Sequence, residues 1–471
     1  MARAPVVVVG SGLAGLSCAF ELRRCGLEVT VVSPARPGCD GASHRVHALA
    51  PWILVTAPWV KGDSPEGFRR DLVRRGGGLE RPEVCEVFAQ HAAAAARELI
   101  DLLDLVPIDG RPTLLPGDEH PRGLRCLPRG GGPVLARLTA ACADAGVRFA
   151  APALVVGLVR SGERVTGAVV RDRRDGTCRL LPAGAVVLAC GGSAGVFPVT
   201  TAPRWCRGSG LALAVAAGAL LHRPQLTQAL PVTATRPPLF PSTAALTGGS
   251  VVVGGRLMAA GQTLDEVTWE VARAGNAGLA AALQATDSAG SAVLPARVKA
   301  MLESAREGLL PLAVAVHHGI GGVAIDAWGR TSLPGLYACG EAAGGVQGRR
   351  RTMGTGLLEA RVFGVRAARA VTHDLSRPRL GADGGGSLAC PPPAAAPERL
   401  EEALDRLLGP LAVERPPNGV ARALVALEEW PRDDTGMASP AAELAGLRRS
   451  AAVALLLAER TGQNEIGGGQ G

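Results

Sequence analysis

Two glycine-rich segments, far apart in the chain, have the residue types that hold a phosphorylated cofactor. Residues 6–16 read VVVVGSGLAGL, a valine run followed by a Gly-x-Gly-x-x-Gly turn. A strand that enters a helix through such a turn places a pyrophosphate on backbone N–H groups at the helix N-terminus. Residues 331–341 read TSLPGLYACGE and end in Gly-Glu, where Glu341 can accept hydrogen bonds from sugar hydroxyls. The chain therefore leaves a dinucleotide-binding domain and returns to complete it, which favours FAD over NAD.

The end of the second predicted strand also argues against NAD. Residues 27–32 complete a βαβ unit, and many NAD-binding units carry an acidic residue at this point to hold the ribose. Here the strand ends at Ser33, followed by Pro34. A later buried strand, residues 185–190, runs into Gly191 and Gly192, which offer another close approach of the backbone to a cofactor.

Composition excludes several classes of partner. The 471 residues allow roughly two to four domains, and the net charge of +8 comes mostly from dispersed arginines. No aromatic residues alternate with these arginines and no nucleic-acid motif is present, so the basic residues are interpreted as solvated surface and no nucleic-acid partner is expected. The apolar run at residues 211–221 is shorter than the about 20 residues that span a bilayer, so no membrane association is expected.

Cysteine usage and the start of the chain predict a cytoplasmic location. The 11 cysteines include no Cys-x-x-Cys pair, which indicates reduced thiols and no zinc or iron–sulfur site, so no metal is predicted. The chain enters its first strand almost at once and leaves no room for a secretory signal.

Periodicity and composition predict an α/β protein. The pattern indicates a helix over residues 81–105, short strands over 148–190, an apolar helix over 204–219 and helical structure over 264–310. We expect a Rossmann-like FAD-binding domain that is discontinuous in sequence, with an inserted α+β cap domain and a C-terminal helical domain. The expected boundaries are 1–229 and 313–380 for the FAD-binding domain, 230–312 for the cap, and 396–462 for the helical domain.

Several further motifs follow in a fixed order. Residues 62–66 read GDSPE, followed by Asp71-Leu72 and by GGL at 77–79. Residues 317–323 read HHGIGGV, and after them come Asp326, GRT at 329–331, the Gly-Glu pair, GVQG at 345–348, Arg351 and LLE at 357–359. With this order and spacing the chain resembles the flavoprotein family that contains L-aspartate oxidase and the flavoprotein subunits of succinate dehydrogenase and fumarate reductase. The resemblance covers most of residues 1–371.

The resemblance implies an FAD that lies extended across the first domain. It implies that Ser33 lies near the adenosine ribose, that Glu341 lies near a ribose or the ribityl chain, and that Gly356 and Leu357 lie near the flavin ring. Two further serines, Ser43 and Ser209, belong to the expected cofactor site. The residues expected at the pyrophosphate are Gly10, Ser11, Gly12, Leu13, Ala14 and Gly15.

His44 lies in a loop whose role the resemblance leaves open. Residues 43–48 read SHRVHA. They resemble the loop in which succinate dehydrogenases join a histidine covalently to the flavin, whereas aspartate oxidases usually hold FAD non-covalently there. His44 is therefore either a covalent attachment point or a hydrogen-bonding residue. The family's Gln-Gly-Gly continuation is replaced here by residues 49–51, Leu-Ala-Pro.

Two residues are expected to bind the substrate. By resemblance, His317 and Arg351 anchor a dicarboxylate such as L-aspartate, and bidentate arginine is suited to carboxylate recognition. Two other family residues are changed: Leu230 stands where a substrate-side histidine is usual, and Val251 stands at the position of the cap arginine that moves a proton. Arg256 is the nearest replacement, although its spacing does not match.

Three functions remain open from the sequence. The first is an L-aspartate oxidase-like enzyme that converts L-aspartate to iminoaspartate, with oxygen or fumarate as acceptor, in the first step of NAD synthesis. The second is a divergent flavoprotein of the fumarate reductase and succinate dehydrogenase type that acts on another organic acid, which the apolar Leu230 and Val251 favour. The third is a catalytically weak FAD-binding protein that acts as a partner or regulator. The sequence does not indicate the oligomeric state.

Overall fold

A parallel sheet forms the centre of the hydrophobic core in the larger part of the molecule. The computed structural model describes residues 4–377, except for residues 40, 47–52, 57–59, 109, 116–117, 132, 198, 204, 225 and 285–293. The strands of the sheet lie in the order β18 (Leu336–Ala338), β10 (Ala185–Leu188), β1 (Val6–Val9), β2 (Val29–Val32) and β6 (Arg148–Ala150). Every residue of β1 and β10 is buried, as expected for parallel strands covered by other elements.

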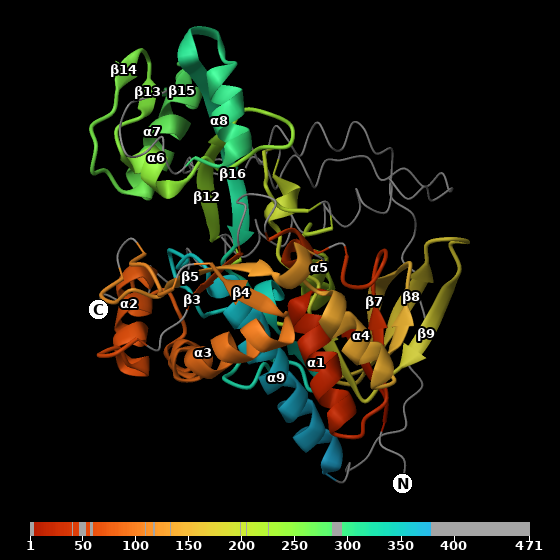
Figure 1. Cartoon of the computed structure of the whole chain (residues 1–471). Coiled ribbons are helices and arrows are strands. Elements are labelled where there is room, and N and C mark those ends of the chain that lie inside the picture. The colour runs from red at the N-terminus through yellow and green to blue at the C-terminus, as the bar shows by residue number, and fades with distance from the viewer. Residues whose placement is uncertain are drawn as a thin grey trace, which may run out of the picture.

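The helices of this part come from both of its sequence segments. Helix α1 packs against α9, which belongs to the returning segment, and α9 also packs against α3 (Figure 1). Side chains of all three helices and of the parallel sheet share one hydrophobic core. The helices of this part are α1 (Leu13–Arg24), α2 (Pro65–Gly76), α3 (Pro82–Leu102), α4 (Ala136–Asp144), α5 (Ser209–Ala217) and α9 (Thr355–Ser376). The predicted return of the chain into its first domain therefore supplies both β18 and α9.

Three smaller sheets accompany the parallel sheet. Strands β7 (Ala153–Ser161), β8 (Arg164–Asp172) and β9 (Cys178–Pro182) form an antiparallel sheet. Strands β3 (Ile53–Thr56), β5 (Gly123–Pro128) and β4 (Leu105–Pro107) form a second one. The third contains β11 (Leu221–His222), β17 (Gly322–Ala324) and β19 (Ala343–Gly344).

The described residues between two long strands, β12 (Thr227–Thr233) and β16 (Leu309–Gly319), form a second unit above this part, which we call the cap (Figure 1). Its sheet has the order β12, β16, β15 (Ala281–Gln284), β13 (Val251–Val253) and β14 (Arg256–Leu257). Its helices are α6 (Thr243–Thr247), α7 (Leu264–Asn276) and α8 (Ala296–Glu303). The cap has a hydrophobic core of its own. Because β12 and β16 run through both expected boundaries, the cap and the larger part share two continuous strands.

The prediction of helical structure over residues 264–310 was wrong in part. Helices α7 and α8 lie in this range, but β15 separates them and pairs with both β13 and β16. The run Ala281–Leu283 is apolar and fully buried between those two strands, so pairing across the sheet decides its conformation. The expected C-terminal helical domain, residues 396–462, lies outside the described residues.

No helix among the described residues is long and apolar enough to cross a membrane.

A buried arginine holds the segment before α2 against the loop that precedes β5. Arg122 is fully buried, and its Nη2 and Nε donate to the two carboxylate oxygens of Asp63 at 2.6 and 2.7 Å. Its Nη1 donates to Asp71 on α2, and its guanidinium lies 5.1 Å from the ring centroid of Phe68. The motif residues Asp63 and Asp71 thus bind the same arginine side chain, which belongs to a distant part of the sequence.

Replacing Arg122 by leucine should lower the free energy of unfolding by about 3–5 kcal/mol, because two buried carboxylates lose their partner. Urea denaturation of the purified protein measures this loss. The control is Arg129→Leu, which removes an exposed ion pair with Asp104 and should have a much smaller effect. Equal losses in the two variants would contradict a structural role for the buried network.

Candidate active site

A cavity of about 820 Å³ extends from the N-terminus of α1 to the base of the cap. This volume lies within the range of about 300–1,000 Å³ that is usual for cofactor and ligand sites. The walls come from the β1–α1 turn, the loop at residues 41–46, strands β12 and β16, the start of α9, and cap residues 240–244. The cavity therefore brings most of the predicted cofactor residues and both predicted substrate residues into one space.

The three glycines of the first turn have different surroundings. Gly10 has a φ of +108°, and a Cβ there would clash with the carbonyl oxygen of Ala189. A Cβ at Gly15 would clash with the carbonyl oxygen of Gly10. At Gly12, by contrast, a Cβ would meet nothing closer than Ser43 Oγ at 3.6 Å, and the residue lines the cavity. Gly10 and Gly15 thus allow the tight turn, while Gly12 leaves room for a ligand.

The N-terminus of α1 faces the cavity without a capping side chain. Gly12 occupies the N-cap position, and the only side-chain bond to the first turn among the described residues is from Leu13 N–H to Ser43 Oγ, at 3.2 Å. Leu13 and Ala14 line the cavity together with Gly12. Free N–H groups and the helix dipole make this end of α1 favourable for an anion such as a pyrophosphate.

The other predicted cofactor residues lie along the same cavity, with two exceptions. Ser33 Oγ lies 2.7 Å from Ser11 Oγ, and both serines line the cavity. Gly15 lies beneath the turn. His44 does not line the cavity although its neighbour Ser43 does, and its Nδ1 is buried without a hydrogen-bond partner in the described part of the chain. The cavity-lining residues among the remaining predictions are Gly10, Ser209, Glu341, Gly356 and Leu357.

A β-bulge turns two consecutive histidines toward the cavity. In the β12–β16 pair, Gln228 lies opposite His318 and Ala229 lies opposite Val316, so His317 is the extra residue of the bulge. Consecutive residues of a regular strand point to opposite faces of the sheet, and a bulge changes that alternation. Both imidazoles therefore line the cavity, with ring centroids 6.4 Å apart.

Both histidines are held neutral by their surroundings. Burial, reinforced by the positive charge of Arg351, lowers the pKa of His317 to about 3, and its Nδ1 lies 2.8 Å from Thr201 Oγ1. The same two causes lower the pKa of His318 well below its ordinary value, and the neighbouring imidazole contributes further. Neutral imidazoles can both donate and accept a hydrogen bond.

Arg351 provides the positive charge of this end of the cavity. Its Nη1 donates to Gln228 Oε1 at 3.1 Å, while its buried Nε has no hydrogen-bond partner among the described residues. Burial lowers the pKa of Arg351, and the carboxyl groups of Glu359 and Glu341 oppose that shift. An arginine stays charged under these conditions, so the guanidinium can take a carboxylate in a bidentate contact.

Two buried carboxyl groups flank this arginine. Glu341 follows β18 in the short turn Gly340–Ala342, and its Oε1 accepts the Gly319 N–H at 2.9 Å and lies 3.4 Å from His318 Nδ1. Glu359 on α9 accepts a hydrogen bond from Gln347 Nε2 at 3.1 Å. Burial raises the pKa of each of these two carboxyl groups to about 7. Glu341 thus lies beside His318, and its expected contact with a cofactor sugar stays a prediction.

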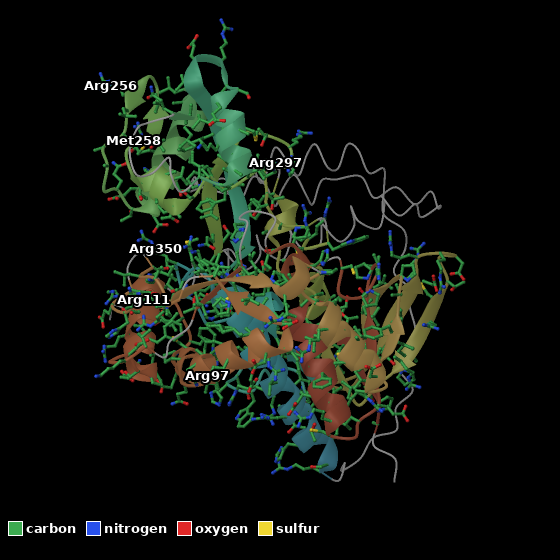
Figure 2. The ribbon with its side chains drawn as sticks, viewed as in Figure 1. Arg97, Arg111, Arg256, Met258, Arg297 and Arg350 are labelled. Atoms are coloured by element: carbon green, nitrogen blue, oxygen red, sulfur yellow. The ribbon has the colours of Figure 1, made fainter. Side chains whose placement is uncertain are left out.

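The changed family positions leave the cap without a cavity-lining arginine among the described residues. Val251 is fully buried in β13, opposite Leu283, and belongs to the core of the cap. Arg256 is exposed on β14, and Figure 2 shows it at the outer side of the cap, away from the larger part. Leu230 does line the cavity, next to Phe240.

Three residues of the site were given no role by sequence reasoning. Gln228 lies two residues before Leu230, His318 is the second histidine of HHGIGG, and Glu359 ends LLE. Alternation along a strand predicts that only one of two adjacent histidines faces a site, and the bulge that overrides this rule leaves no signal in the sequence.

The described residues contain no group of three or more His, Cys, Asp or Glu side chains that could hold a metal ion.

Comparisons with known proteins identify relatives of this chain. The FAD binding domain family matches residues 5–357. The L-aspartate oxidase of Caulobacter vibrioides is 33% identical over 459 residues, which cover 90% of this chain and 86% of that protein. The L-aspartate oxidase of Streptomyces coelicolor is 32% identical and covers 78% of this chain and 68% of its own length. Among solved structures, the fold is similar to that of Mycobacterium smegmatis Sdh1 in complex with UQ1, with a TM-score of 0.80, 22% identity, and coverage of 97% and 86%.

The residues of the cavity fit the FAD that these relatives imply. The open space at Gly12 and the uncapped N-terminus of α1 suit the pyrophosphate. The hydroxyl groups of Ser11 and Ser33 lie where the end of β2 meets the cavity and can bind a ribose. The comparisons thus confirm the predicted cofactor and the predicted fold class, and the cavity supplies residues that can hold the cofactor.

Replacing Gly12 by valine should abolish FAD retention without unfolding the protein, because the added side chain enters the cavity space and meets no close neighbour in the chain. Visible absorbance of the purified protein measures the bound flavin, and circular dichroism measures the fold. The control is Gly110→Val, at an exposed glycine where a Cβ also meets no atom within 4 Å. A flavin content like that of the wild type in the Gly12 variant would exclude the pyrophosphate from this turn.

The variant Glu359→Gln should gain thermal stability relative to the wild type when the pH is raised. In the apoprotein, the thermal midpoint of the variant minus that of the wild type should be more positive at pH 8 than at pH 5. The folded protein holds the Glu359 pKa near 7, above its value in the unfolded chain, so folding favours the protonated carboxyl. The contribution of Glu359 to the stability of the wild type is fully present below the pKa of this group in the unfolded chain, and it is lost as the pH rises through about 7. Thermal melts at pH 5 and pH 8 measure the difference between variant and wild type, and a difference independent of pH would contradict the raised pKa.

Proposed function

The chain belongs to the L-aspartate oxidase family of FAD-dependent oxidoreductases, and we propose that its substrate is L-aspartate, which it oxidises to iminoaspartate. The observation that carries this proposal is the position of Arg351. Its guanidinium lies in the same cavity as the cofactor turn, with one buried nitrogen unpartnered in the described chain. A carboxylate is the group that satisfies such a cation.

The residues around Arg351 support binding of the second polar end of the substrate. His317 presents a neutral imidazole that can donate to a carboxylate oxygen. Gln228 accepts a hydrogen bond from the guanidinium and helps to hold it in place. In the cap, Thr243 and Thr247 line the cavity and add hydroxyl groups. Together these groups would hold a small dicarboxylate while the cap excludes water.

FAD, when bound, would be the two-electron acceptor that receives a hydride from the Cα of the substrate. The chain's own residues then have three tasks: they orient the Cα–H bond, neutralise the carboxylates and accept the proton of the amine. Reoxidation by oxygen or fumarate would complete the turnover, and the product would enter NAD synthesis.

A second candidate substrate is an organic acid with an apolar end. Leu230 and Phe240 line the cavity, and Leu230 stands where the family usually has a histidine. No cap arginine reaches the cavity in the described part of the chain. These residues favour a substrate with a single carboxylate. Competition separates the two candidates: dicarboxylates should displace one another from an L-aspartate site and should not affect a site for apolar monocarboxylates.

Replacing Arg351 by leucine should abolish the bleaching of the flavin band by L-aspartate under anaerobic conditions, because the substrate loses its charged anchor. Visible absorbance records bleaching and the amount of bound FAD in the same sample. The control is Arg349→Leu, two residues earlier, which removes an exposed arginine and should behave like the wild type. Turnover like that of the wild type in the Arg351 variant would refute the assignment.

A further inference from the structure

Oxidation of an amino acid needs a group that accepts a proton, and none of the described cap residues that line the cavity has an acidic or basic side chain. The amine of L-aspartate is an ammonium near neutral pH, and it must lose a proton before its lone pair can form a C=N bond. Val251 is buried in the core of the cap and Arg256 lies on its outer side (Figure 2). The acceptor must therefore be sought among the described residues that line the cavity.

His318 has the geometry of such an acceptor. It is 9% exposed, lines the cavity, and places its Nδ1 3.4 Å from Glu341 Oε1. Its Nε2 makes no hydrogen bond with any residue in the described part of the chain. In its ionised form, Glu341 beside Nδ1 favours the tautomer that carries the proton on Nδ1, and this tautomer leaves the Nε2 lone pair free.

The backbone holds Glu341 in place for this task. The Gly319 N–H donates to the same Oε1 at 2.9 Å, and Gly319 directly follows His318 in β16. A Cβ at Gly192 would clash with the Glu341 carboxyl, so the glycine allows the carboxyl group to approach the chain. The end of β16 thus positions both the His318 imidazole and the Glu341 carboxyl group.

We propose that His318, oriented by Glu341, accepts the proton of the substrate ammonium. This proposal rests on the proposed function. His318 Nε2 takes one proton from the ammonium, and the nitrogen lone pair then forms the C=N bond while the Cα–H bond breaks. The electron pair of that bond leaves with the hydride to the two-electron acceptor, and the product is the iminium form of iminoaspartate.

The other groups that face His318 fit different tasks. The charged or titratable groups that affect it are Glu341, His317 and Arg351. Arg351 is a permanent cation and cannot accept a proton. His317 has its Nδ1 at 2.8 Å from Thr201 Oγ1, which ties that ring to the wall of the cavity. Glu341 accepts a backbone N–H and lies behind the imidazole. When L-aspartate binds, the net negative charge of its two carboxylates and one ammonium raises the basicity of His318.

The variant His318→Gln tests the proposal in the holoenzyme. The anaerobic rate of flavin reduction at saturating L-aspartate should fall by about 100- to 10,000-fold, the usual contribution of a general base. The Kd of malonate, a dicarboxylate without an amine, should change by less than about threefold. The control is His222→Gln, at a partly buried histidine outside the cavity whose Nε2 lies 2.9 Å from the Leu79 carbonyl oxygen, and it should keep the rate of the wild type.

A fall of less than about tenfold in the His318 variant, or a loss of malonate binding parallel to the loss of rate, would overturn the proposal. A second readout needs no turnover: nitrogen-15 spectra of histidine-labelled holoenzyme with malonate should show His318 neutral and protonated on Nδ1. A proton on Nε2 would also overturn it. If L-aspartate does not bleach the wild type, the proposed function fails, and the spectra still decide the tautomer.

Discussion

The burial of the Arg351 guanidinium is the interaction on which the rest of the site depends. A charged group removed from water needs nearby anions or hydrogen-bond acceptors, and Gln228 provides one acceptor at 3.1 Å. The two nearby carboxyl groups, Glu341 and Glu359, have pKa values of about 7, so each is only partly ionised at neutral pH. With both histidines neutral, the site retains an unsatisfied positive charge that an anionic substrate can complete. The positive charge of Arg351 thus determines both the electrostatics of the site and the kind of ligand that the site favours.

The same constraint explains how the two segments of the chain cooperate. Arg351 precedes α9, its acceptor Gln228 comes from β12, and the histidines come from β16, which continues into the cap. The strands that carry the cap therefore also carry residues that we propose to bind the substrate. An exposed ion pair between Arg350 and Asp265, with Nε and Oδ2 3.0 Å apart, adds a surface contact between the cap and the larger part. Figure 2 shows Arg350 at this junction. Exposed pairs of this kind contribute little stability, so the shared strands position the cap.

Sequence reasoning predicted the parts of the site that depend on local patterns. The Gly10–Gly15 turn and the Gly-Glu end of the last parallel strand have local causes, namely a tight turn and a buried strand. Other features depend on contacts between distant residues. Arg122 binds Asp63 and Asp71 more than 50 positions away, and neither aspartate indicates its partner. The bulge that turns both histidines into the cavity arises from the pairing with Gln228, which alternation along one strand cannot show. Likewise, Glu341 lies beside His318 because the turn after β18 meets the end of β16, where the Gly319 N–H donates to the Glu341 carboxyl group, and the Gly-Glu motif does not indicate this contact.

The structure of the holoenzyme with FAD and malonate would test the central claim most directly. The account predicts the pyrophosphate at the N-terminus of α1, one malonate carboxylate on the Arg351 guanidinium with His317 beside it, and the Nε2 of His318 directed at the bound ligand. Malonate bound away from Arg351, or a His318 side chain turned out of the cavity, would contradict it.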